Sequence, residues 1–309
     1  MDTDPPTRFR LGTRGSPLAL AQAHMVADAL TKAHGWAAHV AQLVIVKTTG
    51  DMVQDRPLAE IGGKALWTKE LDRALLTGEI DCAVHSMKDV ETIRPEEIAI
   101  AATLPRAAVQ DRLIGATSIA ALPQGARMGT SSPRRAAQLR HLRPDLSIVS
   151  FRGNVATRLA KLEAGEADAT LLAAAGLDRL GQGDVGADIP LETMLPAPAQ
   201  GAVGIECRTD DDDARALIAA IGDQSTMACV LAERALLAGL NGTCHSPIAA
   251  LALWRGDRLW LRAELYSEDG AIKTGGECML APGDDAAAHD FAARLLAGAP
   301  AAIAALFAG

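Results

Sequence analysis

The chain has 309 residues, of which 49% are hydrophobic and 22% charged, and 30 Lys and Arg against 38 Asp and Glu give a net charge of −8. This composition is typical of a globular protein and excludes the disordered and collagen-like classes. At about 150 residues per domain, the length predicts two or three domains with a cleft between them. The acidic balance and the 3% aromatic content argue against a protein that wraps nucleic acid, so any basic cluster is expected to bind a small anion.

The cysteines and the two ends of the chain predict a cytoplasmic protein. The odd number of five cysteines contains no C-x-x-C pair, which indicates reduced thiols and no zinc site. Residues 1–14 carry acidic residues and prolines where a signal peptide needs a basic start and an apolar core. The apolar stretch 295–309 is too short for a membrane span and is interrupted by Pro300, so it is expected to form one or two terminal helices.

Strands and helices alternate from the start of the chain. Apolar or alternating runs predict strands at 9–13, 40–46, 81–85 and 98–102. Helical patterns lie between them at 17–34 and 64–76, the second closed by Gly78. This order predicts a parallel sheet with right-handed crossovers.

The alternation then restarts and later changes character. Strands are expected at 112–115, 128–130, 146–151 and 169–173, with helices at 133–142 and 154–164. A strand at 202–207 is expected to return the chain to the first sheet. A helix from about 223 to 240, strands at 248–254, 259–265 and 272–280, and a helix from 285 indicate a small α+β domain. The predicted domains are 1–104 with 199–221, 105–198, and 222–309.

A short motif occurs twice between a predicted strand and a predicted helix. Gly12-Thr13-Arg14-Gly15-Ser16-Pro17 resembles Gly129-Thr130-Ser131-Ser132-Pro133. Ser16 and Ser132 are placed as N-caps, each followed by a proline that lacks an N–H at the first helical position. Ordinary capping explains either site alone, but both helix starts would also present free N–H groups at the sheet edge where α/β proteins bind ligands.

Several arginines lie at predicted strand ends and helix starts. Arg134 and Arg135 begin a helix whose dipole they oppose, which makes a purely structural role poorly motivated. Arg14 follows the first strand, and Arg179 ends an apolar strand-plus-turn at 171–180. Since guanidinium groups bind planar carboxylates in a bidentate manner, arginines of this kind are candidates for a carboxylate-binding cluster in one cleft, to which Arg152 and Arg158 also belong.

Polar residues follow the buried strand around residue 84. Ser86, Lys88 and Asp89 lie where this strand becomes a loop, the usual position of catalytic side chains in α/β proteins. A carboxylate at Asp89 would stabilise a developing cation, while a turn or capping role is equally compatible with the sequence. His85 is interpreted as a core histidine.

The turn 241–247 places Cys244 beside His245. A Cys–His nucleophile pair is conceivable, but adjacent residues on a strand point to opposite sides. A loop cysteine is also a point of covalent attachment. Two further matches are not significant: G-x-G-x-x-G at 181–186 precedes no helix, and Gly62-Gly63-Lys64 lacks the other residues of a P-loop.

Taken together, these segments resemble the porphobilinogen deaminase (hydroxymethylbilane synthase) family over nearly the whole chain. The resemblance is carried by Thr13-Arg14-x-Ser16-Pro17-Leu18-Ala19-Leu20, Thr48-Thr49-Gly50-Asp51, Gly62-Gly63-Lys64, Ala83-Val84-His85-Ser86-Met87-Lys88-Asp89, Gly129-Thr130-Ser131-Ser132-x-Arg134-Arg135, Arg152-Gly153-Asn154-Val155-x-Thr157-Arg158, Ala174-Ala175-Gly176-Leu177-x-Arg179-Leu180 and Gln200-Gly201-Ala202-Val203-Gly204-Ile205-Glu206. It implies an α/β fold of two doubly wound domains that resemble periplasmic binding proteins, plus a small C-terminal α+β domain.

The resemblance also implies a reaction and a cofactor. The family joins four porphobilinogen molecules head to tail, with loss of ammonia, into linear hydroxymethylbilane for tetrapyrrole biosynthesis. It primes this chain with a dipyrromethane cofactor attached as a thioether to the cysteine that matches Cys244. By the same matching, Asp89 is the catalytic aspartate, which stabilises the cationic azafulvene formed as ammonia leaves.

Further residues are assigned roles by the same resemblance. Cofactor binding falls to Ser86, Lys88, Thr130, Ser131, Ser132, Arg134, Arg135 and Arg158; substrate binding to Arg14, Ser16, Arg152, Arg179 and Gln200; and a lid over the site to Lys64 and Trp67. The expected protein is a cytoplasmic monomer that acts on the small molecule porphobilinogen and binds no metal, nucleic acid or membrane.

Two alternatives remain at this point. A two-lobed anion-binding protein would share the doubly wound architecture, and a cysteine hydrolase would use Cys244 and His245. Ammonia release from porphobilinogen would distinguish the enzyme from the receptor, and ester turnover would reveal the hydrolase.

Overall fold

The computed structural model describes residues 6–48, 68–243 and 245–307. The chain divides into two compact units: unit 1 comprises Met1–Arg106 and Ala202–Met227, and unit 2 comprises Ala107–Gly201 and Ala228–Gly309. The three-domain division expected from the sequence stays a prediction.

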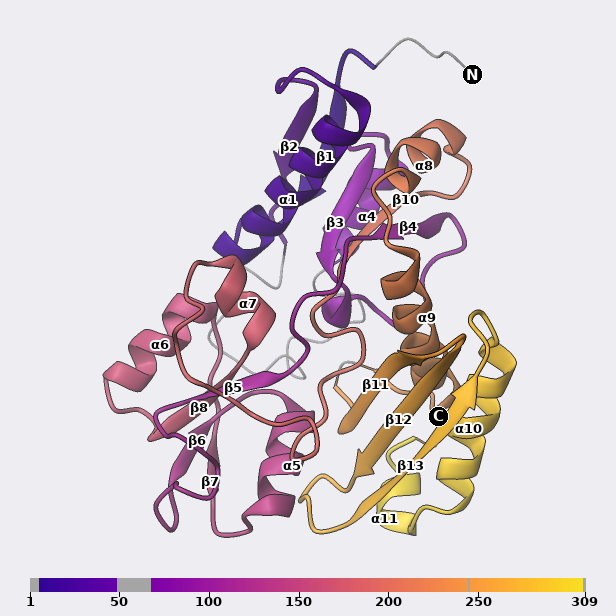
Figure 1. Cartoon of the computed structure of the whole chain (residues 1–309). Coiled ribbons are helices and arrows are strands. Elements are labelled where there is room, and N and C mark those ends of the chain that lie inside the picture. Colours follow the sequence, from indigo (N-terminus) through magenta and orange to yellow (C-terminus); the bar gives the residue numbers. More distant parts are fainter. Residues whose placement is uncertain (1–5, 49–67, 244, 308–309) are drawn as a thin grey trace. The chain divides into compact units, whose positions relative to one another are not determined.

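Unit 1 is built on a sheet with the strand order β2-β1-β3-β10-β4 (Figure 1). Its strands are β1 (Phe9–Thr13), β2 (Ala41–Ile45), β3 (Cys82–Ser86), β4 (Ile98–Thr103) and β10 (Val203–Arg208). Strands β1, β2 and β3 pair in parallel, as the alternation predicts, and β10 returns to this sheet as expected. The sheet is nevertheless mixed, because β10 is antiparallel to both β3 and β4.

Helices cover both faces of this sheet. On one face α1 (Pro17–His34) packs Val26 and Leu30 into a core with Cys82 and Val84. On the other face α4 (Lys69–Leu76) packs with Ala83. Neighbouring residues of β3 therefore face opposite cores, which explains why this strand is a continuous apolar run rather than an alternating one. Of the helix expected at 64–76, residues 64–67 lie outside the described residues.

The first sheet of unit 2 has the order β7-β6-β8-β5-β9. Its strands are β5 (Asp111–Ile114), β6 (Arg127–Gly129), β7 (Ser147–Val149), β8 (Ala169–Ala173) and β9 (Ala187–Asp188), and its helices are α5 (Pro133–Leu142) and α6 (Val155–Glu163). The strand-plus-turn expected at 171–180 is wrong beyond residue 173, because a helix, α7 (Ala174–Arg179), follows β8 directly. The run of alanines and leucines there fits a buried helix as well as it fits a strand.

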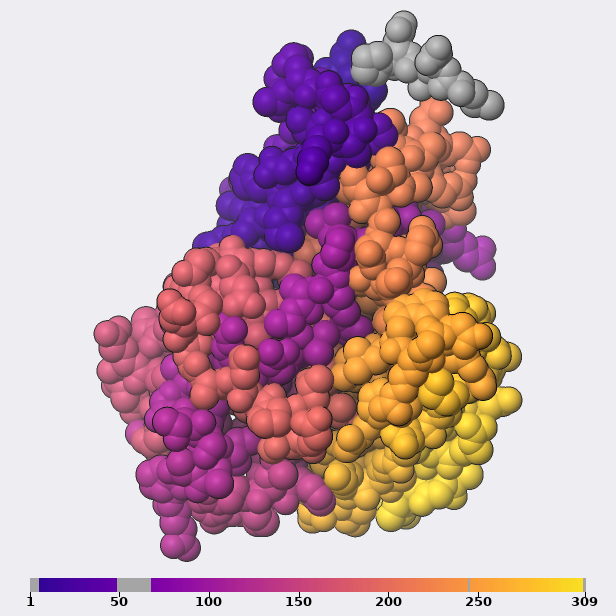
Figure 2. Space-filling model, in the orientation of Figure 1, coloured from indigo at the N-terminus to yellow at the C-terminus, as the bar shows by residue number. Residues whose placement is uncertain are grey.

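The second sheet of unit 2 is an antiparallel meander of β11 (Ile248–Arg255), β12 (Arg258–Tyr266) and β13 (Lys273–Leu280). Its core side packs against residues of α9 (Gln224–Gly239) and α10 (Asp285–Ala297), and α11 (Ala301–Ala304) follows. Figure 2 shows the atoms of these C-terminal strands and helices, orange to yellow, packed closely together. The expected α+β arrangement is confirmed.

In residues 6–48, 68–243 and 245–307 no single helix is long and apolar enough to cross a bilayer. Two helices pass the length and composition criteria only together, α8 (Asp212–Ala219) and α9, and they meet at an angle of 116°.

Candidate functional site

In unit 1 the polar end of β3 opens into a pocket. Strand β3 ends at Ser86, and the chain turns through one 3-10 helix, η1 (Met87–Asp89). The pocket is lined by Arg14, Ser16, Leu18, Ala19, Gln22, Val84, His85, Ser86 and Asp89. Four of the residues predicted to be functional, Arg14, Ser16, Ser86 and Asp89, thus share one pocket, at the end of a strand as the sequence indicates.

The N-cap predictions are confirmed at both repeated motifs. Ser16 accepts a hydrogen bond from the N–H of Ala19 at 3.3 Å and precedes Pro17. In unit 2, Ser132 accepts one from the N–H of Arg135 at 3.4 Å and precedes Pro133. Both serines therefore have a capping role, which does not by itself speak for or against ligand binding.

One residue of the pocket was missed by the sequence reasoning. Gln22 on α1 is buried, and its Nε2 lies 2.7 Å from the Oγ of Ser86. The contact fixes the Ser86 hydroxyl at the pocket wall. The available signal was a glutamine four residues after Leu18 on the buried face of the helix, where an apolar residue would be usual.

The loop motif of unit 2 is tied to the chain around it. The Ser131 hydroxyl donates to the carbonyl of Phe151 at 2.8 Å, and the Thr130 hydroxyl accepts from the N–H of Ser132 at 3.2 Å. Each hydroxyl oxygen retains capacity for a further hydrogen bond.

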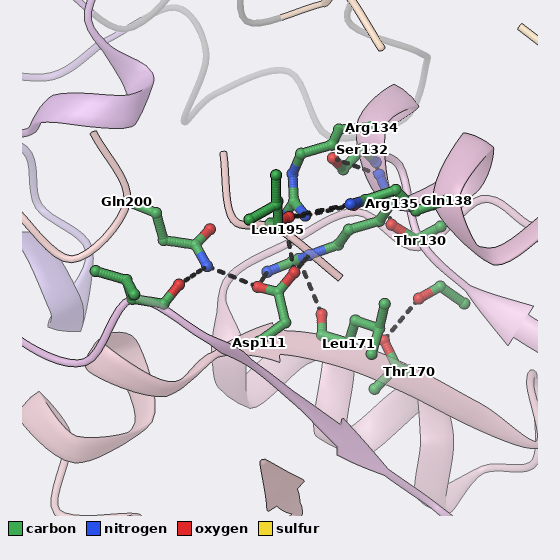
Figure 3. A network of polar contacts seen from close by, with 12 residues as sticks. Asp111, Thr130, Ser132, Arg134, Arg135, Gln138, Thr170, Leu171, Leu195 and Gln200 are labelled. Atoms are coloured by element: carbon green, nitrogen blue, oxygen red, sulfur yellow. Dashed lines mark hydrogen bonds and ion pairs between the residues drawn. The ribbon is translucent and has the colours of Figure 1, made fainter. Parts of the chain in front are cut away.

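Arg134 and Arg135 have a structural partner that the sequence did not indicate (Figure 3). Both guanidinium groups are buried and meet the carboxylate of Asp111 at 2.8 Å and 2.7 Å. Arg134 also donates to the carbonyl of Leu195 at 2.7 Å, and Arg135 to that of Leu171 at 2.9 Å. The reasoning that a structural role is poorly motivated at this helix start is therefore wrong, because Asp111 supplies the opposite charge.

Asp111 is a strongly held carboxylate. Burial by itself would raise the pKa of Asp111, but the charges and hydrogen bonds of Arg134 and Arg135 outweigh it and hold this pKa well below its ordinary value. Gln200 adds a hydrogen bond from its Nε2 to Asp111 at 2.8 Å and another to the carbonyl of Val109 at 2.7 Å. The predicted substrate residue Gln200 is thus buried within the same network (Figure 3).

Other arginines of unit 2 keep buried donor atoms without a partner. The Nη1 of Arg152 and the Nε of Arg179 are buried and have no hydrogen-bond partner among the described residues. Burial lowers the pKa of the Arg179 guanidinium from its ordinary value, although Asp178 opposes this. Arg179 donates elsewhere to the carbonyl of Gly201 at 2.7 Å, and Arg158 to that of Gly153 at 3.0 Å. Because buried N–H groups are nearly always hydrogen-bonded, these two nitrogens favour an acceptor supplied by a bound ligand.

Some of the predicted site residues lie outside the described residues. They are Lys64, Trp67 and Cys244. Lys88 belongs to η1 in unit 1, half-buried. The expectation that residues of both units meet in one cleft stays a prediction.

Comparison with known proteins assigns the family. The family described as "Porphobilinogen deaminase, dipyromethane cofactor binding domain" matches residues 9–216, and "Porphobilinogen deaminase, C-terminal domain" matches residues 227–289. The chain belongs to the porphobilinogen deaminase family. The prediction of this family, of an enzyme acting in tetrapyrrole biosynthesis and of a dipyrromethane cofactor is confirmed, and the receptor and hydrolase alternatives are set aside.

Relatives within the porphobilinogen deaminase family are similar over almost their full length. The chain is 58% identical over 310 residues to "Porphobilinogen deaminase" of Sphingopyxis alaskensis, covering 98% of each chain. It is 54% identical over 304 residues to that of Paracoccus denitrificans, covering 96% of each. A periplasmic substrate-binding protein of an ABC transporter from Coxiella burnetii matches with 16% identity and a TM-score of 0.43, over 71% of this chain and 94% of that one.

Proposed function

We propose that this chain joins four porphobilinogen molecules head to tail into linear hydroxymethylbilane, using Asp89 as the catalytic carboxylate. Family membership over residues 9–216 and 227–289 supports the reaction. The observation that carries the residue assignment is the pocket of unit 1, in which Asp89 lies with Arg14 and Ser86 at the end of β3.

Each cycle breaks the carbon–nitrogen bond of an aminomethyl group. Ammonia leaves, a carbon–carbon bond forms to the next pyrrole ring, and that ring loses a proton. A positive charge develops on the substrate as ammonia departs. The Asp89 carboxylate stabilises this charge and accepts hydrogen bonds from pyrrole N–H groups, which is the electrostatic role that a fixed anion fulfils best.

The residues of the chain also fit a dipyrromethane cofactor. Its pyrrole rings carry the same acetate and propionate groups as the substrate, and these need cationic donors; Arg152 and Arg179 each keep a buried nitrogen without a partner among the described residues, which suits pyrrole carboxylates of either ligand. An external carboxylate would satisfy both. We assign cofactor contacts to Ser86, Lys88, Thr130, Ser131, Ser132 and Arg158, and substrate contacts to Arg14, Ser16, Arg152 and Arg179. When bound, the cofactor supplies the terminal pyrrole to which the first substrate is joined.

Three predicted residues need a narrower assignment. The Asp111 carboxylate already accepts hydrogen bonds from Arg134, Arg135 and Gln200. We propose that they hold the start of α5 and the segment before β10 in place, and that any ligand contact uses only their remaining donors. Lys64 and Trp67 keep their proposed lid role from the family resemblance.

Cys244 is proposed as the attachment point of the cofactor. A thiolate captures the same electrophile that later extends the chain. Intact protein should therefore be heavier than the encoded chain by two linked pyrrole units, and peptide mapping should place this mass on Cys244. Cys244→Ser should lack the added mass, while Cys278→Ser, in β13, should keep it. Finding only the bare mass in freshly expressed, active protein would contradict the proposal.

The catalytic role of Asp89 is tested by an isosteric change. Asp89→Asn keeps the shape but removes the charge, and we expect kcat for ammonia release to fall about 10²–10³-fold in the folded protein. Asp28→Asn, the same change on the exposed side of α1, should be silent. Near-normal ammonia release by folded Asp89→Asn would exclude Asp89 from the chemistry.

We also propose a cytoplasmic monomer. The described cysteines, Cys82, Cys207, Cys229 and Cys278, are free, which suits a reducing compartment. One chain supplies every residue that the proposal uses, and the net charge of −8 disfavours binding to nucleic acid. Light scattering of the active enzyme at twice the chain mass of 32.1 kDa would contradict the monomer.

A further inference from the structure

Beside His85, which lines the pocket of unit 1, lies a carboxylate that the proposed reaction does not use. Glu206 on β10 is fully buried. Arg94 donates to both of its oxygens, from Nε to Oε1 and from Nη2 to Oε2, each at 2.8 Å. The Nε2 of His85 lies 3.1 Å from Oε2. Burial would raise the pKa of Glu206, but His85 and Arg94 lower it to about 2, so this group stays ionised at neutral pH.

The two partners of Glu206 come from opposite sides of Asp89 in the sequence. His85 precedes Asp89 by four residues, and Arg94 follows it by five. The segment that carries Asp89 is therefore flanked by two residues that lie against one carboxylate of the neighbouring strand, and the hydrogen bonds to this carboxylate come from Arg94. Backbone hydrogen bonds hold its middle, from the N–H of Met87 to the carbonyl of Ala202 at 3.1 Å and from that of Val90 to Met87 at 3.3 Å.

Arg94 connects this segment to a second element. Its guanidinium donates to Asp72 on α4 at 2.6 Å and 3.2 Å, and to Glu91 at 2.9 Å. Glu91 in turn accepts from the hydroxyl of Thr68 at 2.6 Å. The Arg94 side chain is only 8% exposed, so these contacts are largely shielded from water. A planar guanidinium bonded to three carboxylates has little freedom to move.

We propose that Arg94 is a positioning residue for Asp89: by fastening the chain five residues after η1 to Glu206 and Asp72, it fixes where the Asp89 carboxylate lies in the pocket. This inference rests on the proposed catalytic role of Asp89. Arg94 is not among the residues that line the pocket of unit 1, and the proposal gives it no contact with substrate there. Stabilisation of a developing charge depends on the position of the carboxylate, and displacements near 1 Å cost about 10²-fold in rate.

The test compares Arg94→Lys and Arg94→Met with Arg10→Met. Arg10 is also in unit 1 and pairs with Asp81, which precedes β3 at the end remote from Asp89. We expect kcat for ammonia release, counted per chain that carries the two-pyrrole mass, to fall about 10-fold in Arg94→Lys and about 10²-fold in Arg94→Met. KM should stay within about twofold. Arg10→Met should lower the unfolding midpoint but leave kcat unchanged.

Arg94→Met leaves buried carboxylates unpaired and is at risk of failing to fold. Arg94→Lys keeps the charge, but a lysine cannot bond to both oxygens of Glu206 and also reach Asp72. If Arg94→Met does not fold, the kcat of Arg94→Lys by itself tests the positioning role. Wild-type kcat in folded Arg94→Lys would overturn the inference. A loss of kcat in Arg10→Met equal to that in Arg94→Lys would also overturn it, because general destabilisation would then be the cause.

A double variant separates this inference from the proposed function. If Arg94 acts through Asp89, adding Arg94→Lys to Asp89→Asn should reduce the residual rate by less than about twofold, whereas independent effects would multiply. A full 10-fold further loss would overturn the positioning role while leaving Asp89 as the catalytic residue. Near-normal activity of Asp89→Asn alone would instead overturn the proposed function, and this inference with it.

Discussion

Replacing Asp111 by asparagine should destabilise unit 2 more than any surface change of the same kind. The carboxylate has a side-chain exposure of 1% and bonds to Arg134 and Arg135 at 2.8 Å and 2.7 Å. Asn keeps the volume and one acceptor oxygen but leaves two buried guanidinium charges without an anion. Breaking a buried ion pair by removing one partner costs about 3–5 kcal/mol.

A separate estimate from the hydrogen bonds of Asp111 gives a loss of unfolding free energy of the same size. Three donors share its oxygens: Arg134, Arg135 and Gln200. Hydrogen bonds to a charged group contribute about 1.5–3 kcal/mol each, and the Asn oxygen retains part of them. For a cooperative unit of about 150–250 residues, each kcal/mol lowers the midpoint by about 2–4 °C, so we expect a fall of roughly 6–20 °C.

Asp188→Asn is the matched control for this variant. Asp188 also pairs with an arginine of unit 2, Arg112, at 2.6 Å, but its side chain is 50% exposed. Solvent screening limits such pairs to about 0.2–1 kcal/mol. Thermal and urea unfolding of both variants at pH 7, followed by circular dichroism, gives the comparison. An Asp111→Asn variant as stable as Asp188→Asn would refute the reasoning that the arginine pair depends on this one carboxylate.

Three further outcomes follow from the structure. Gly129→Ala should lower the free energy of unfolding, measured in urea, by about 1–3 kcal/mol, because the added Cβ would lie 2.5 Å from the buried ring of Phe151. An unchanged urea midpoint would show that the ring moves aside freely. Arg158→Leu should impair cofactor loading, measured by intact mass, while exposed Arg255→Leu should load normally; equal loading would remove the carboxylate-binding argument. The native pKa of Glu206, about 2 against an ordinary 4.5, means that its contribution to stability is complete above about pH 4.5 and is lost as pH falls toward 2. Glu206→Gln should therefore be less stable than wild type at pH 7, with a gap that narrows below pH 4.5, and a gap independent of pH would contradict the shift.

The sequence by itself determined most of the helices and strands and the strand end at which the pocket of unit 1 lies, but it did not indicate helix α7. Helices at 17–34 and 133–142 begin and end where the capping serines, the prolines and the apolar spacing predict, because these signals act within a few residues of each helix end. Ser86 and Asp89 could be placed at a strand end because the apolar run before them stops abruptly. Family membership was also readable, since the motifs stand in the sequence itself.

Only the tertiary structure decided which charges meet. Asp111 is 23 residues from Arg134, and Glu206 is 112 residues from Arg94. No local pattern relates positions so far apart, and a strand carrying Glu206 could have paired in either direction. The antiparallel return of β10 beside β3 sets His85 next to Glu206, while the burial of both carboxylates makes their arginine partners obligatory. Arg134 and Arg135, which the sequence offered as ligand-binding residues, therefore form ion pairs with Asp111 inside the protein, because a charge buried away from water needs an opposite charge nearby.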